Sequence, residues 1–205
     1  MDYFEFRKKM FLPGCFTPGQ VYAWYPEFNK SNLVRWEQKG RLVKLRNGYY
    51  SFPEYTAEKD FPLYIANRIY RPSYVSLHTA LAFFGLIPES VVQITSVSTL
   101  KTASFINSFG TYSYHSVRPA LMFGYDTRPM QGGRSILLAK PEKALLDLLY
   151  LYPFYNSKEE LEALRIDHDI LQDHFDSDLF RTYVAQIRRK AVERRAELFL
   201  KVYDV

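Results

Sequence analysis

The apolar pattern of the sequence changes its period at Gly40, and this change constrains how the N-terminal segment can fold. Before Gly40 the spacing of apolar residues is helical. Thr17 is followed directly by Pro18 and, three positions after Thr17, by a glutamine, which is the arrangement of a capping box with proline in the first turn. The pattern predicts one helix from Pro18 to about Trp24 and a second helix that begins near 29–31 and ends before Gly40.

After Gly40 the residues alternate as they do in β-strands. Two short apolar stretches, 42–45 and 49–52, flank Asn47-Gly48, a dipeptide that favours a tight hairpin turn. Another short helix is predicted over residues 2–10. The expected order is therefore helix, helix, turn, helix and hairpin, which is the order of a winged helix-turn-helix.

In a winged helix-turn-helix, the second helix of the pair enters the major groove of DNA. Leu33 and Trp36 are three positions apart and are expected to face the core. Arginine suits guanine edges and asparagine suits adenine edges, so Arg35 and Asn32 are the candidates for reading bases. The complete set of predicted DNA-binding residues is Lys30, Ser31, Asn32, Arg35, Lys39, Lys44, Arg46 and Asn47, with Lys30, Lys44 and Arg46 expected at phosphates. The alternative is that these side chains form a solvated surface of a fold that only packs against the rest of the chain.

The net charge of +5 lies entirely in this segment. Residues 1–52 contain nine Lys and Arg against four Asp and Glu, whereas the rest of the chain has equal numbers of basic and acidic residues. A basic segment joined to a neutral body favours binding to a polyanion such as DNA.

The remainder of the chain predicts a body that mixes helices with antiparallel strands. Residues 53–62 are polar and read as a linker. Beyond them, a strand is expected over 91–97, followed by two hairpins and several helices, the last a single long helix from about Asp178. The predicted fold class is α+β, with a winged helix-turn-helix domain over residues 1–53 and an α+β domain with a helical C-terminus over residues 62–205.

A series of short motifs lies along the chain. In the N-terminal segment the motifs occupy 32–40 and 48–50, and in the body they occupy 74–77, 80–81, 85–89, 95–97, 109–114, 124–125 and 139–147. Over residues 1–155 this combination resembles the AbiEi family of antitoxins, which belong to abortive-infection systems and are also transcriptional regulators. The N-terminal motifs are similar to the winged helix that those proteins carry.

The resemblance implies an antitoxin of a bacterial type IV toxin-antitoxin system that also represses its own operon. The implied partners are double-stranded DNA, as an operator with inverted repeats, and a nucleotidyltransferase-like toxin. The alternative function is a winged-helix transcriptional regulator whose C-terminal domain senses a ligand and which has no toxin partner.

Several other residues are of types that occur in catalytic or metal-binding sites. Glu142 and Lys143 resemble a fragment of metal-dependent nucleases, but they have a sufficient explanation in the first turn of a helix. The four histidines do not cluster, since even His168 and His174 are six positions apart. We therefore expect no enzymatic activity, no cofactor and no metal. A single cysteine and the lack of long apolar segments favour a cytoplasmic protein without a membrane segment.

Overall fold

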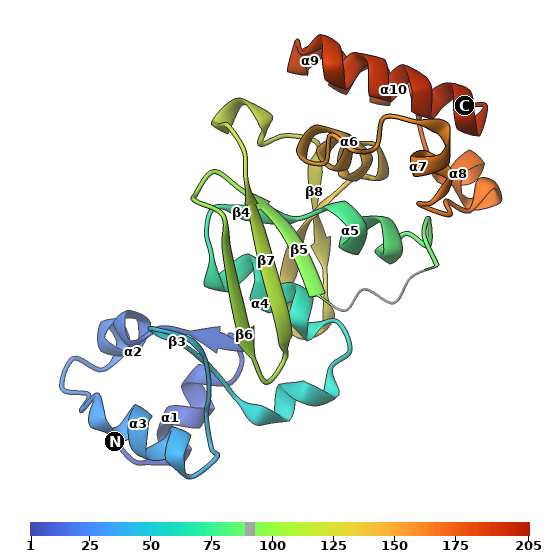
Figure 1. Ribbon diagram of the computed structural model, residues 1–205. Helices are drawn as coiled ribbons and strands as arrows, with labels where there is room; N and C mark the ends of the chain where they lie inside the picture. The colour runs from blue at the N-terminus through green and yellow to red at the C-terminus, as the bar shows by residue number, and fades with distance from the viewer. Residues whose placement is uncertain (89–92) are drawn as a thin grey trace.

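A computed structural model describes residues 1–88 and 93–205 of the protein. Figure 1 shows a small N-terminal unit, a central β-sheet and a group of C-terminal helices on the side of the sheet opposite the N-terminal unit. The fold is a mixture of helices and strands, so the predicted α+β class is confirmed. None of the helices in the described part of the chain combines the length and apolarity needed to cross a bilayer.

The N-terminal unit, residues 1–52, contains three helices and a small antiparallel sheet. In chain order its elements are α1 (Tyr3–Met10), β1 (Cys15–Phe16), α2 (Pro18–Trp24), α3 (Ser31–Gln38), β2 (Val43–Arg46) and β3 (Tyr49–Ser51). The strands lie in the order β1-β3-β2. The capping box predicted at the start of α2 is present, with the Thr17 side chain accepting from the backbone N–H of Gln20. The Asn47-Gly48 turn joins β2 to β3, and Gly48 has the positive φ of 78° that such a turn needs.

The core of the N-terminal unit is aromatic. Leu33 and Trp36 face inward, as predicted, with exposures of 0% and 6%. The Phe6 ring of α1 lies 4.6 Å from the Trp36 ring and 5.3 Å from the Phe16 ring, measured between centroids. Packing of α1 and β1 against α3 therefore fixes which face of α3 remains open to solvent.

In the described part of the body, the central sheet has six strands in the order β6-β7-β5-β4-β9-β8. Their bounds are β4 (Ser73–Val75), β5 (Gln93–Ser98), β6 (Ala103–Asn107), β7 (Gly110–Ser116), β8 (Tyr125–Pro129) and β9 (Ser135–Ala139). Both predicted hairpins are present, as β6-β7 and β8-β9. The first strand of the second hairpin is expected over 121–125 but spans Tyr125–Pro129. Of the strand expected over 91–97, residues 91 and 92 lie outside the described residues.

The expectation that the body's strands are all antiparallel is wrong. β5 pairs with β7, and β4 pairs with β9, in parallel. Turn residues determine the pairing inside each hairpin, but they do not determine which of its two strands docks on the central pair β4-β5. The second strand of each hairpin takes that place, and this makes the sheet mixed.

Helices cover the sheet and form the C-terminal end of the body. They are α4 (Phe61–Ile69), α5 (Leu77–Phe83), α6 (Pro141–Leu151), α7 (Lys158–Glu162), α8 (His168–His174), α9 (Ser177–Ile187) and α10 (Lys190–Tyr203). The single long helix expected from Asp178 is instead two helices, separated at Arg188, which has a left-handed backbone with φ of 52°. The break lets Ile187 and Val192 both be buried, at 3% and 1% exposure, although their spacing puts them on different faces of a continuous helix.

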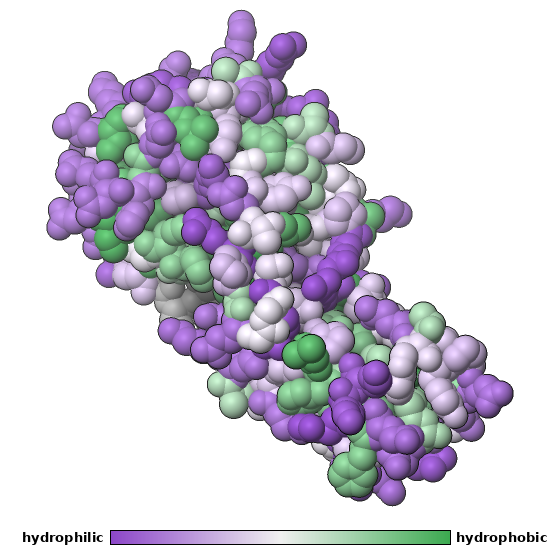
Figure 2. All heavy atoms as spheres, turned by 180° about the vertical axis from the view of Figure 1, so that it is seen from behind, coloured by the Kyte–Doolittle hydropathy of each residue, from purple (hydrophilic) through white to green (hydrophobic). Residues whose placement is uncertain are grey.

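The segment expected as a linker is folded and packed. Residues Pro53–Ala57 form a short 3-10 helix, η1. Within it, Tyr55 is 3% exposed and stacks on Phe61 with ring centroids 4.3 Å apart. Figure 2, from behind, shows the smaller N-terminal lobe joined to the larger body, with hydrophilic side chains over much of both. The packing of η1 makes residues 53–57 a folded connection between the N-terminal unit and the body rather than a flexible linker.

Candidate nucleic-acid interface

Five of the eight predicted DNA-binding residues lie on α3 or directly at its two ends. Figure 1 shows α3 on the side of the N-terminal unit away from the central sheet. Arg35 and Lys39 are exposed, and Asn32 is half-buried. The arrangement presents positive charge and an amide on one open helical surface.

The start of α3 is held by Asn29. The side-chain oxygen of Asn29 accepts from the backbone N–H of Ser31 at 3.0 Å and from its hydroxyl at 2.7 Å. Ser31 is exposed but its hydroxyl hydrogen is committed to this turn, so its oxygen remains as an acceptor. Lys30 precedes the helix and is exposed. The local turn therefore orients the residues at the helix start from which base contacts would be made.

On the hairpin, Lys44 and Asn47 are exposed, whereas Arg46 points into the body. The Arg46 guanidinium donates to the backbone oxygen of Ile69 at 2.6 Å and lies 4.6 Å from the centre of the Phe105 ring. The basic residues of the predicted hairpin did not indicate whether Arg46 contacts a DNA phosphate or packs against the body. In this structure Arg46 joins the N-terminal unit to the body.

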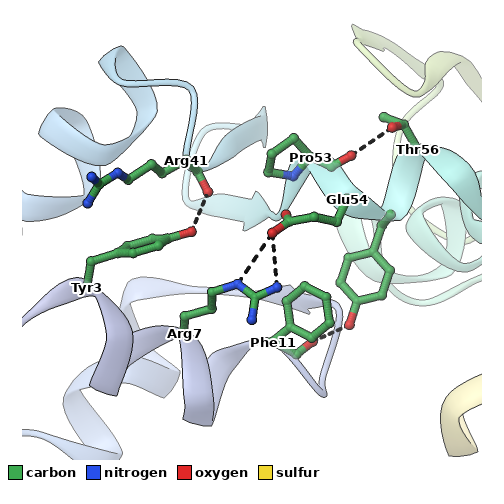
Figure 3. A network of polar contacts seen from close by, with 8 residues as sticks. Tyr3, Arg7, Phe11, Arg41, Pro53, Glu54 and Thr56 are labelled. Atoms are coloured by element: carbon green, nitrogen blue, oxygen red, sulfur yellow. Dashed lines mark hydrogen bonds and ion pairs between the residues drawn. The ribbon is translucent and has the colours of Figure 1, made fainter.

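Further contacts hold the N-terminal unit against the body. The side-chain amide of Asn107, at the end of β6, donates to the backbone oxygen of Leu45 at 3.2 Å, and the Tyr64 hydroxyl donates to the backbone oxygen of Pro13 at 2.7 Å. Figure 3 shows a third connection, in which Arg7 of α1 reaches Glu54 of η1 at 3.0 Å. These contacts involve α1, the loop that precedes β1, and β2. They leave the outer face of α3 uncovered.

A buried charged cluster in the body was missed by sequence reasoning. Lys143 and Asp147 of α6 form an ion pair with side chains 0% and 1% exposed. The other oxygen of Asp147 accepts from the Tyr74 hydroxyl and from the Ser76 hydroxyl, both at 2.8 Å. Burial, together with the negative charge of Asp147, raises the pKa of Tyr74 well above its ordinary value, so this hydroxyl stays a donor. The available signal was the spacing of four between a lysine and an aspartate inside an apolar run, and the cluster ties α6 to β4.

No family model matches the chain. The chain is 28% identical over 200 residues to the zinc metalloprotease ZmpC of Streptococcus pneumoniae serotype 4. The matched segment covers 97% of this chain but only 10% of that protein, so the chain spans about a tenth of the length of this relative.

This match contradicts the expectation that the chain has no enzymatic activity, because the matched protein is named as a protease. Sequence motifs alone could not reveal such a relationship, since distant similarity is spread over a whole segment rather than held in one motif. We tested whether the residues of this chain fit the zinc that the name implies. Among residues 1–88 and 93–205, no group of three His, Cys, Asp or Glu side chains is placed to hold a metal ion. The donor set of the described residues therefore does not fit a zinc site.

Proposed function

We propose that residues 1–53 are a winged helix-turn-helix domain that binds double-stranded DNA, with α3 in the major groove. The observation that carries this proposal is the uncovered helix α3, which lies on the side of the N-terminal unit away from the central sheet (Figure 1). Its Arg35 and the following Lys39 are exposed, and Asn32 is half-buried. The element order α1, β1, α2, α3, β2, β3 and the concentration of the net charge of +5 in this unit also support it. Lys30, Ser31, Lys44 and Asn47 complete the proposed contact set.

We further propose that the chain acts as the antitoxin of a type IV toxin-antitoxin pair, with residues 62–205 opposing a nucleotidyltransferase-like toxin. The support is the resemblance of the body motifs to the AbiEi family, among them residues 139–147, which include the buried Lys143–Asp147 pair. Binding of the N-terminal domain to inverted repeats upstream of its own gene would repress the operon.

DNA binding is tested by fluorescence anisotropy with a duplex from upstream of the gene. We expect Arg35→Ala to lower the affinity by about 1 to 3 kcal/mol and to relax specificity at one base pair, whereas Lys44→Ala should lower the slope of log affinity against log salt by about 1. Arg181→Ala, which removes an exposed arginine of α9, is the matched control. Affinity that responds to neither Arg35→Ala nor added salt contradicts the assigned interface.

The antitoxin role is tested by growth. The reading frame next to the gene is expressed alone and together with this chain, and we expect toxicity in the first case and rescue in the second. Arg35→Ala should still rescue growth when both genes are driven from unrelated promoters, because the body is proposed to oppose the toxin. A neighbouring product that is harmless, or toxic without rescue, rejects the antitoxin role but not the DNA-binding role.

A further inference from the structure

A cavity of about 600 Å³ lies where α4 ends and β4 begins, next to β8 and β9. Its polar lining includes Asn67, Arg68, Arg71 and Ser73, and Tyr125 and the apolar side chain of Met122 also line it. All the lining residues are neutral or basic. The volume is in the range of sites that hold small molecules.

Two of the lining side chains are buried polar groups with a free hydrogen-bonding atom. Asn67 is 6% exposed and Ser73 is 4% exposed. The Asn67 side-chain oxygen accepts from the backbone N–H of Leu137 at 2.6 Å, which assigns the amide orientation and leaves Nδ2 as the other atom. Neither Asn67 Nδ2 nor the Ser73 hydroxyl has a hydrogen-bond partner among the described residues.

Such atoms are uncommon in folded proteins, because leaving a buried donor without a partner costs free energy. Asn67 Nδ2 can only donate, and a hydroxyl can donate as well. The residues that line the cavity therefore include two with unpartnered donors and none that is acidic, and an acceptor on a ligand would satisfy these donors.

The two arginines supply charge at the same place. The Nε of Arg71 donates to the backbone oxygen of Asn67 at 3.0 Å, so Arg71 is anchored to the residue that carries the free amide. The Arg68 guanidinium lies 4.7 Å from the centre of the Tyr64 ring, which holds it against α4. Anchored guanidinium groups bind oxyanions with less loss of conformational entropy than mobile ones.

We propose that this cavity binds a small phosphate-bearing molecule. Its phosphate oxygens accept from Asn67 Nδ2, the Ser73 hydroxyl and the guanidinium groups of Arg68 and Arg71. The remainder of the molecule packs against Tyr125 and Met122. This site does not depend on the proposed DNA binding, because it lies in the body and is measured without DNA.

The test is isothermal titration calorimetry of the full chain with inorganic phosphate and, separately, with adenosine monophosphate, each at millimolar concentration. Binding of the monophosphate that is tighter than that of inorganic phosphate identifies an organic phosphate as the ligand class, and equal affinities identify inorganic phosphate. Binding of neither probe overturns the proposal.

Three variants locate the binding. Arg71→Ala should weaken it at least about tenfold, the scale of a charge-assisted hydrogen bond. Asn67→Asp keeps the acceptor for Leu137 but replaces the free donor with an oxygen, so it should weaken binding by a similar factor. Ser73→Ala removes a hydroxyl without a partner, so it should weaken binding while leaving the free protein at least as stable.

Weaker binding by Ser73→Ala, together with a free protein that is at least as stable, identifies a ligand site. A purely structural role of the Ser73 hydroxyl would instead make this variant less stable. Arg194→Ala, which removes an exposed arginine of α10 that does not line the cavity, is the charge control and should bind as the unmodified chain does. If the three cavity variants bind as tightly as the unmodified chain, or if Arg194→Ala weakens binding equally, the proposed site is wrong.

Discussion

The buried Lys143–Asp147 pair makes a quantitative prediction about stability. Both side chains are at most 1% exposed, and Asp147 also accepts from the Tyr74 and Ser76 hydroxyls. Lys143→Met leaves the carboxylate with two neutral donors and no cation. Asp147→Asn leaves the ammonium buried without its carboxylate partner, with the Phe123 ring centre 4.7 Å away. Removing one partner of a buried pair strands a charge, so each variant should lose about 3 to 5 kcal/mol of unfolding free energy.

The double variant Lys143→Met/Asp147→Asn should be more stable than either single variant. The methionine packs against the same aromatic rings, and the asparagine carbonyl still accepts from the two hydroxyls. Neither of the two positions then carries a charge. We expect the double variant to lose about 1 to 3 kcal/mol, which gives a coupling energy of at least about 3 kcal/mol between the two positions.

The assay is urea unfolding followed by circular dichroism, because both tryptophans, Trp24 and Trp36, lie in the N-terminal unit and report poorly on the body. Lys158→Met is the matched control. Lys158 has the same spacing from Glu162 on α7, but that pair is exposed, with an N–O distance of 3.5 Å, and the loss should be less than about 0.5 kcal/mol. A loss below about 1 kcal/mol for Lys143→Met, or additive losses in the double variant, would refute the reasoning.

Three further predictions concern backbone, protonation and reactivity. Gly124 has a φ of 70°, and a Cβ there would lie 3.0 Å from the Lys143 side chain. Gly48 has a similar φ of 78°, but a Cβ there would meet nothing within 4 Å, so Gly124→Ala should lower the melting temperature more than Gly48→Ala. Equal shifts would argue against a steric contribution at Gly124. Burial lowers the pKa of His115, so the neutral form is favoured in the folded state, and stability should be complete above the ordinary histidine pKa and fall as the pH drops below it. Urea midpoints across this range should fall less in His115→Gln, and an identical pH profile would contradict the assignment. Burial raises the pKa of the Cys15 thiol to about 12, so iodoacetamide at pH 8 should modify the protein only after unfolding, as mass spectrometry would detect; rapid modification of the native chain would show that the thiol is accessible.

Local structure followed from the sequence wherever a few adjacent residues determine it. The capping box at Thr17, the Asn47-Gly48 turn and the inward placement of Leu33 and Trp36 were all predicted. Each depends on hydrogen bonds or packing within a few positions of the chain, so a single sequence carries the whole signal. The open face of α3 follows from the same periodicity, because burying Leu33 and Trp36 leaves Arg35 outside.

What the sequence could not decide involves residues that meet only in the folded chain. Arg46 contacts Ile69 and Phe105, and Asp147 contacts Tyr74 and Ser76, across separations of 23 residues or more. Distant similarity was equally invisible to motif reasoning, as the match to a metalloprotease shows.

The sequence by itself therefore determined the helices, the turns and the charge of the N-terminal unit, because these depend on neighbouring residues. The tertiary structure decided which strand of each hairpin docks on β4-β5, where the last helix breaks at Arg188, and which charged side chains are buried. The physical reason is that these choices are made by competition among whole packing surfaces, in which local propensity contributes less free energy than the burial of apolar area.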